Sequence, residues 1–317
     1  MEKILRRLNR MELEFLGTSS SVSTTNRNVS GICLTLAGQT FLFDCGDGLA
    51  RQFTRAKSKL SDLTNVFLTH LHGDHFYGLP ALLMRLGERA TSVSGPKGLV
   101  RMLGSLVPGP RVTWKEIERM GGVVYSDERW EVEAVPIRHS AWCVGYVVRE
   151  QPDNRLPNLD HQKLIKEFGL PPGPLYKQLS LGQKVLHNDV WIHPEQVVLP
   201  RQLLPLRKVV ILGDTFDPSA ISLAADNCDV LVHEATCSNA DVSTALRQKH
   251  STAGMAGAFA RSIKAKNLIL THFSPRLCPE TLMEEASALQ VLKQQAAEAF
   301  DSPNVFLAHD YFTFPIN

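Results

Sequence analysis

Three histidines and one aspartate fall within six residues of the stretch LTHLHGDHFYGLP (68–80). Neutral imidazole is a common ligand of zinc and similar metals, and a carboxylate adds negative charge to such a site. On a tight turn, side chains at these offsets can point to one side but cannot all reach one ion comfortably. Two ions with a pair of ligands each fit better. The four residues are His70, His72, Asp74 and His75.

The residues on either side of this stretch indicate how it is held in place. The run NVFL (65–68) is apolar and β-branched like a buried strand, and residues 76–90 have apolar side chains at helical spacing. The polar residues therefore lie on a turn at the carboxyl edge of a sheet, where open α/β sheets bind ligands. Two metals need more ligands, and we expect them where other apolar runs stop, at His139, Asp214 and His272.

The remaining histidines have other predicted roles. We expect His309, which also ends an apolar run, to pack rather than to bind metal, and His233 either to support the neighbouring site or to pack. A segment rich in proline, glycine and charge carries three more, which we expect to be solvated: His161, His187 and His193.

Strand-like and helix-like runs alternate along the chain. Early strands at short intervals, followed by alternation with helices, predict mixed sheets covered by helices. NVFLTH (65–70) recurs as NLILTH (267–272), so one cleft could collect ligands from both halves. We expect strands near 13–17, 31–38, 40–46, 65–70, 130–137, 143–150, 208–215, 228–235, 267–272 and 304–310, and helices near 76–90, 97–105, 218–226, 251–264 and 279–300.

Composition is that of an ordinary soluble globular protein. The chain has 317 residues, of which 44% are hydrophobic and 21% charged, and its formal charge is only +2. This net charge is too small to indicate a nucleic-acid partner by itself. No apolar run reaches the roughly 18 residues of a membrane helix. The six cysteines form no CxxC pair, which favours reduced thiols in an intracellular compartment.

Two segments stand outside the main pattern. Residues 1–10 are basic and weakly amphipathic, and we interpret them as an N-terminal extension, with a short organelle address as the alternative. Residues 151–196 have little periodicity, and a connection of that length is either functional or an insertion that projects from the body.

Several motifs together resemble the metallo-β-lactamase superfamily: THLHGDH, a later histidine, the aspartate of GDT and a final THFS. Finer features resemble the tRNase Z family within it, namely FLGTSSSV, FLFDCGDG, HGDHFYGLP, GLPPGPLY, HEAT and HSTAGMAG. The match runs over about residues 11–314. This resemblance implies an αββα sandwich of two mixed β-sheets flanked by helices, with a projecting arm inserted at about 151–196.

The resemblance also implies a role for each site residue. His70, His72 and His139 would hold one zinc, Asp74, His75 and His272 the other, and Asp214 would bridge them. Asp74 would also orient or deprotonate the attacking water. His250 and Glu234 match the proton-donating pair beside the leaving oxygen, and Asp44 matches a carboxylate that supports the metal loop without binding metal.

The activity implied is zinc-dependent cleavage of precursor tRNA on its 3′ side, with Mn²⁺ or another divalent ion as the alternative to zinc. The resemblance further implies a homodimer and RNA contacts by Arg27, Asn28, Gly173, Pro174 and Lys177. Cytoplasm is the expected compartment, with the nucleus or an organelle as alternatives. Two other functions fit the metal motif: hydrolysis of a small phosphodiester or thiolester, and noncatalytic RNA binding.

One motif departs from the family pattern. The loop Pro-x-Lys-x-Arg-Asn, which senses the tRNA 3′ end in the family, is matched by STTNRN (23–28). Ser23 and Thr25 replace the proline and the lysine, so rejection of tRNA that already bears CCA does not follow from the resemblance.

Overall fold

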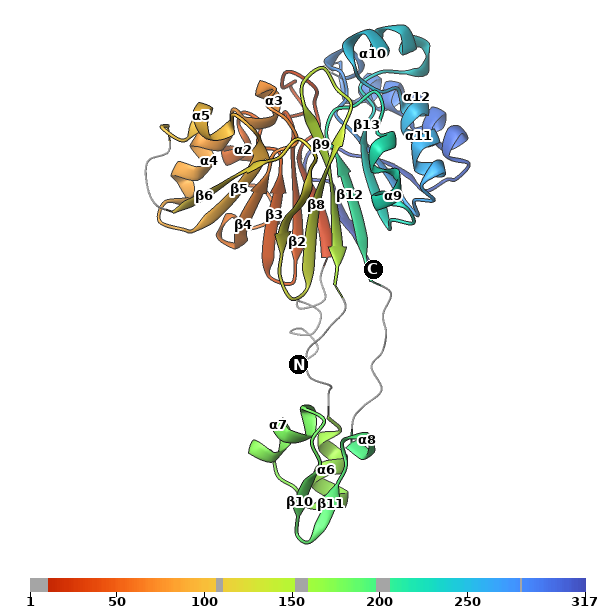
Figure 1. Ribbon diagram of the computed structural model, residues 1–317. Coiled ribbons are helices and arrows are strands. Elements are labelled where there is room, and N and C mark those ends of the chain that lie inside the picture. Colours follow the sequence, from red (N-terminus) through yellow and green to blue (C-terminus); the bar gives the residue numbers. More distant parts are fainter. Residues whose placement is uncertain (1–10, 107–110, 152–158, 198–205, 280) are drawn as a thin grey trace. The chain divides into compact units, whose positions relative to one another are not determined.

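The computed structural model describes residues 11–106, 111–151, 159–197, 206–279 and 281–317, so the predicted extension at 1–10 lies outside the described residues. The chain divides into two compact units (Figure 1). We call the unit formed by the chain up to Glu150 and from Arg207 onward the body, and the unit Gln151–Leu206 the arm.

Two mixed sheets form the centre of the body, each with seven strands among the described residues. The order of the first sheet is β16 (Thr313–Pro315), β1 (Met11–Gly17), β2 (Gly31–Leu36), β3 (Gln39–Phe43), β4 (Leu63–Phe67), β5 (Thr91–Pro96) and β6 (Val112–Ile117). The order of the second is β15 (Val305–Leu307), β14 (Leu268–Thr271), β13 (Val230–Glu234), β12 (Lys208–Leu212), β9 (Cys143–Glu150), β8 (Trp130–Ile137) and β7 (Gly122–Ser126).

Within each sheet a parallel half adjoins an antiparallel half. The pairs from β3 to β6 are parallel, as are those from β12 to β15. The carboxyl ends of β4, β12 and β14 therefore carry the turns on which six of the predicted ligands lie, and the seventh, His139, follows β8 in the antiparallel half of the second sheet.

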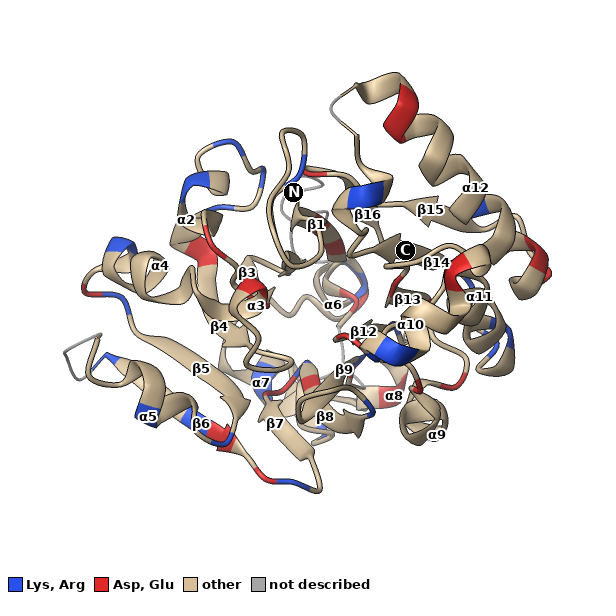
Figure 2. Ribbon diagram, turned by 90° about the horizontal axis from the view of Figure 1, so that it is seen from above, with Lys and Arg blue, Asp and Glu red and all other residues tan. Residues whose placement is uncertain are grey.

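An apolar core fills the space between the sheets, and helices cover their outer faces (Figure 2). The inner core includes Phe15, Phe67, Trp130 and Tyr146, all almost completely buried. Helices α2 (Leu49–Gln52), α4 (Leu79–Leu86) and α5 (Leu99–Leu103) pack on the first sheet. Helices α9 (Ser222–Ala225), α11 (Ala253–Ser262) and α12 (Leu282–Phe300) pack on the second. Shorter elements complete the body: α3 (Gly73–Phe76), α10 (Val242–Gln248), and the 3₁₀ turns η1 (Leu60–Asp62), η2 (Ser219–Ile221), η3 (Asn239–Asp241) and η4 (Pro275–Leu277).

The arm has secondary structure and a core of its own. Its elements are α6 (His161–Phe168), α7 (Pro174–Ser180), the hairpin β10 (Val185–His187) and β11 (Val190–Ile192), and α8 (Pro194–Val197). Leu164, Tyr176, Leu179 and Ile192 are among the residues buried in its small cluster. The sequence showed little periodicity here because the elements are too short to repeat a pattern, although Asp160 caps the start of α6.

Two further observations concern the cysteines and the helices. All six cysteines are free and buried, and burial raises the pKa of each thiol. In the parts of the chain that the structure describes, no helix combines the length and apolar character needed to span a membrane.

Candidate metal centre

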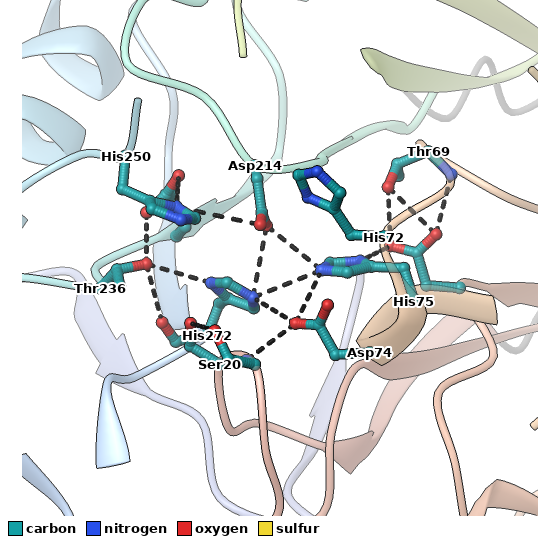
Figure 3. Close-up of polar contacts among 12 residues, drawn as sticks. Ser20, Thr69, His72, Asp74, His75, Asp214, Thr236, His250 and His272 are labelled. Atoms are coloured by element: carbon teal, nitrogen blue, oxygen red, sulfur yellow. Dashed lines mark hydrogen bonds and ion pairs between the residues drawn. The ribbon is translucent and has the colours of Figure 1, made fainter. Parts of the chain in front are cut away.

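The seven predicted ligands come together where strands of both sheets end, and Figure 3 labels five of them, namely His72, Asp74, His75, Asp214 and His272. The loop after β4 contributes four of them, because His72 precedes the first turn of α3 and Asp74 and His75 lie on it. The other three follow β8, β12 and the last residue of β14. They are His139, Asp214 and His272.

One group consists of three imidazoles and a carboxylate. His72 Nδ1 lies 3.0 Å from His70 Nε2 and 3.2 Å from His139 Nε2. One donor atom from each of His70, His72, His139 and Asp214 lies within 4.8 Å of all the others. This spacing fits ligands around a single small cation.

The second group consists of Asp74, His75 and His272. The Nε2 atoms of the two histidines are 3.3 Å apart, and each lies 3.4 Å from Asp74 Oδ2. The backbone N–H of Ser21 donates to the same carboxylate oxygen at 2.8 Å, which holds Asp74 in this orientation.

Asp214 faces both groups with different oxygens. Its Oδ2 lies 3.7 Å from His70 Nε2, whereas its Oδ1 lies 3.5 Å from His75 Nε2 and 3.4 Å from His272 Nε2. A carboxylate that presents one oxygen to each group is suited to bridge two cations.

Hydrogen bonds on the far side of the imidazoles show which nitrogens are free. His75 Nδ1 lies 2.7 Å from Asp44 Oδ2, and His139 Nδ1 lies 2.7 Å from the carbonyl oxygen of Lys249. Carboxylate and carbonyl oxygens only accept, so both rings carry a proton on Nδ1 and can turn a bare Nε2 to the centre. Nitrogen lone pairs and carboxylate oxygens that converge in this way require positive charge, and their types fit two divalent metal ions.

The electrostatics of the site lead to the same conclusion. Burial lowers the pKa of His70 well below its usual value, which favours the neutral imidazole that binds metal. Burial alone would raise the pKa of Asp214, but His272 and His75 hold it well below its usual range. The centre therefore contains a persistent carboxylate surrounded by donor nitrogens.

His250, which is partly buried, and Glu234, which is buried, form a pair beside this centre. His250 Nδ1 lies 3.1 Å from Glu234 Oε1 and 3.8 Å from Asp214 Oδ2. Burial lowers the pKa of His250, but the charge of Glu234 outweighs this effect and raises it to about 9. His250 also lies within ligand distance of Asp214 and His272, yet its Nδ1 is held by Glu234.

Four residues around the centre adopt the left-handed backbone region that side chains rarely occupy. They are Ser21 (φ 63°), Asp44 (φ 58°), Lys249 (φ 63°) and His272 (φ 59°). Such conformations cost free energy and persist where the surrounding structure enforces them, as at binding sites. Here they aim the Ser21 N–H at Asp74 and the Lys249 carbonyl at His139.

A cleft of about 760 Å³ opens onto the centre. His72, Asp74, His139 and His250 line it at the metal groups, so a substrate could reach them from solvent. Its rim includes three exposed cations that suit an anionic ligand: Arg247, Lys249 and Arg276.

Of the predicted RNA-contacting residues, Arg27 and Asn28 belong to the body and make contacts outside the metal groups. Arg27 is only 5% exposed, and its guanidinium donates to Glu285, Thr18 Oγ1 and the carbonyl oxygen of Ala308, so it faces protein rather than solvent. Asn28 donates from its side chain to the carbonyl oxygen of Asp47 at 2.9 Å. The other three belong to the arm: Gly173, Pro174 and Lys177.

Reasoning from the sequence missed several residues that contact the ligands. Thr69 and Thr236 each lie 3.0 Å from the Nδ1 atom of a ligand histidine, and Lys249 and Ser21 contribute only backbone groups. Their neighbours in the motifs LTHLHGDH and HEAT were the available indication. Contacts made by backbone groups cannot be predicted from the residue type, because nearly every residue carries the same backbone N–H and carbonyl groups.

Comparison with known proteins identifies the family. The family model of the anti-Pycsar protein Apyc1 matches residues 11–91. Ribonuclease Z of Synechocystis is 38% identical, with 96% of this chain and 94% of the relative covered. Ribonuclease Z of Haloarcula marismortui is 37% identical, with 95% of each covered.

Solved structures confirm the αββα fold. Human tRNase Z, short form, is similar with a TM-score of 0.65 and 23% identity, over 97% of this chain and 100% of that one. The metallo-β-lactamase fold protein YhfI of Bacillus subtilis has a TM-score of 0.68 and 15% identity, over 97% and 99%. Because the ribonuclease Z relatives are 38% and 37% identical over nearly the full length of both sequences, this chain belongs to the ribonuclease Z family.

Proposed function

We propose that this protein is a metal-dependent endoribonuclease that cuts precursor tRNA on its 3′ side and leaves a 3′-hydroxyl on the tRNA. The observation that carries the proposal is the convergence of seven ligand-type side chains on two adjacent positions, in a chain of the ribonuclease Z family. Two zinc ions per subunit are the expected cofactor, and Mn²⁺ is the alternative.

The two positions would be held by different residues. His70, His72 and His139 would hold one ion and Asp74, His75 and His272 the other, with Asp214 shared. When bound, paired divalent ions supply Lewis acidity that makes water more acidic and stabilises the charge of a reacting phosphodiester.

The chain's own residues would then position the reactants and move protons. Asp74, fixed by the Ser21 N–H, accepts a hydrogen bond from the attacking water and orients it. His250, paired with Glu234, protonates the departing 3′ oxygen of the tRNA, a step typically worth about 10²–10⁴-fold. Asp44 supports the metal loop through His75 and Thr69.

The arm would bind the tRNA through its exposed lysines. Lys166, Lys177 and Lys184 are exposed, and Lys184 Nζ lies 4.7 Å above the ring of Trp191, which is half exposed. Lysines contact phosphates without reading base sequence. The family relationship also favours a homodimer in which the arm of one subunit serves the active site of the other.

The proposed compartment is the cytoplasm, because six buried free thiols suit a reducing environment.

The decisive experiment is incubation of the purified, zinc-loaded protein with a precursor tRNA that carries a 3′ trailer, and mapping of the cut. A single cut at the 3′ side, lost in a chelator and restored by zinc, is the expected result. Hydrolysis of bis(p-nitrophenyl) phosphate without cleavage of precursor tRNA would favour a small-molecule hydrolase instead. Binding of the tRNA without any cleavage would favour a noncatalytic relative.

A further inference from the structure

The same arrangement of four side chains occurs on both sides of the metal centre. A buried carboxylate contacts one histidine directly and a second histidine through a threonine hydroxyl. We propose that Thr69 and Thr236 are positioning residues that fix the ring protons of His70 and His272 on Nδ1, so that both Nε2 atoms stay free for metal. The inference rests on the proposed function only in assuming that these histidines bind metal.

Asp44 anchors the first arrangement. Thr69 Oγ1 lies 2.9 Å from Asp44 Oδ2 and 3.0 Å from His70 Nδ1. A carboxylate only accepts hydrogen bonds, and a hydroxyl has a single proton, so Thr69 donates to Asp44 and can only accept from His70. His70 must therefore carry its proton on Nδ1, and its bare Nε2 faces His72 and Asp214.

Glu234 anchors the second arrangement. The hydroxyl of Thr236 makes a short hydrogen bond to Glu234 Oε2, and it also lies 3.1 Å from the carbonyl oxygen of His272. Both are acceptors, so whichever takes the hydroxyl proton, the oxygen is left to accept from His272 Nδ1 at 3.0 Å. The bare Nε2 of His272 then faces Asp74 and Asp214.

Each carboxylate thereby controls two imidazoles. Asp44 reaches His75 directly at 2.7 Å and His70 through Thr69, so one carboxylate supports a ligand in each metal group. Glu234 reaches His250 directly at 3.1 Å and His272 through Thr236. Partners of this kind, which orient metal ligands, typically change metal affinity by about 10–100-fold when removed.

The recurrence of NVFLTH (65–70) as NLILTH (267–272) supplies a matched control. Thr271 precedes His272 just as Thr69 precedes His70, and it is also buried. Among the described residues, however, no hydrogen bond joins the Thr271 hydroxyl to an imidazole. The hydroxyl that serves His272 comes from the neighbouring strand β13, whose end lies beside that of β14.

The test uses the full chain with each threonine changed to valine, which removes the hydroxyl and keeps the shape, and to serine, which restores it. Zinc affinity is measured by competition with a chromogenic chelator. Histidine tautomers are read from long-range ¹H–¹⁵N spectra of ¹⁵N-histidine protein, metal-free and zinc-loaded, with His70→Gln and His272→Gln used for assignment.

We expect Thr69→Val and Thr236→Val to weaken zinc binding by about 10–100-fold, the serine variants to recover it, and Thr271→Val to match the wild type. The wild-type rings of His70 and His272 should show the Nδ1–H tautomer. An Nε2–H tautomer in the wild type, or valine variants with wild-type zinc affinity, would overturn the inference. Neither readout involves RNA, so failure to cut precursor tRNA would count against the proposed function alone.

Discussion

Glu150 and Arg207 bind each other through two parallel hydrogen bonds where the chain leaves and re-enters the body. Arg207 Nε lies 2.9 Å from Glu150 Oε2, and Arg207 Nη2 lies 3.0 Å from Oε1. The backbone N–H of Glu150 also donates to the Arg207 carbonyl oxygen at 2.9 Å, which continues the antiparallel pairing of β9 with β12. The two ends of the arm's insertion point are therefore fixed side by side.

Because Glu150 and Arg207 are held side by side, the arm between them can be removed cleanly. Replacing residues 151–206 by Asn-Gly should convert β9 and β12 into a hairpin, because a two-residue turn of this type joins antiparallel strands. We expect weaker binding of precursor tRNA but unchanged hydrolysis of bis(p-nitrophenyl) phosphate. Equal loss of both activities would mean that the arm supports the body rather than the RNA.

A charge variant of the intact arm is the matched control for that deletion. Changing Lys166, Lys177 and Lys184 to glutamine should weaken binding of precursor tRNA and lower the slope of its salt dependence by about one per lost phosphate contact. The arm's core is untouched by these changes, so a wild-type salt slope would exclude phosphate contacts at these lysines.

The Glu150–Arg207 pair predicts a specific dependence of stability on pH. Burial raises the pKa of Glu150, but hydrogen bonds and charge from Arg207 and Arg129 outweigh it and lower the pKa below its ordinary value of 4.5. The unfolded chain therefore binds more protons near that pH, and the stabilisation is complete above it and lost as the pH falls through the folded value. Glu150→Gln should lower the melting temperature at about pH 7 and lose its effect in acid. A difference that does not depend on pH would contradict this prediction.

Asp214→Ala should remove the group shared by the two metal positions. Bound zinc should fall below two ions per subunit, and cleavage should drop by about 10³-fold or more, which corresponds to several kcal/mol of lost transition-state stabilisation. Metal analysis and single-turnover cleavage test this. Asp217→Ala is the control, because Asp217 lies three residues after Asp214, pairs with Arg138 and belongs to none of the candidate ligand groups among the described residues.

His250→Gln should slow single-turnover cleavage by about 10²–10⁴-fold and leave two zinc ions bound, and Glu234→Gln should slow it similarly when assayed at saturating zinc. Since the two side chains act as a pair, the double variant should be little slower than either single variant. If the rate losses of the two single variants multiply in the double variant, the two residues have separate roles. Loss of zinc in His250→Gln would instead make His250 a ligand.

Arg27→Met tests whether Arg27 acts in structure or in RNA binding. The variant leaves Glu285 buried without its partner, which should lower the free energy of unfolding by about 3–5 kcal/mol in a urea titration. Adding Glu285→Leu should restore most of this loss, because both charges are then gone. If Arg27→Met folds stably but binds precursor tRNA weakly, the side chain contacts RNA.

The convergence of the seven candidate ligands could be predicted from the sequence, because each follows an apolar run and the strands formed by these runs end close together. The threonine contact to His272 could not, because Thr236 lies 36 residues away and meets it only through the pairing of β13 with β14. Strand β5 was missed because its sequence, TSVSGP, is small and contains glycine and proline. Strands β6 and β7 were missed because they are partly exposed and short.

The buried thiols have a practical consequence. Reagents such as maleimides react with accessible thiolates, and every native cysteine here is both shielded and shifted toward its unreactive form. A single cysteine introduced at an exposed arm position such as Lys184 should therefore label selectively in the otherwise unmodified protein. Fluorescent dyes placed there could follow the approach and departure of RNA in real time.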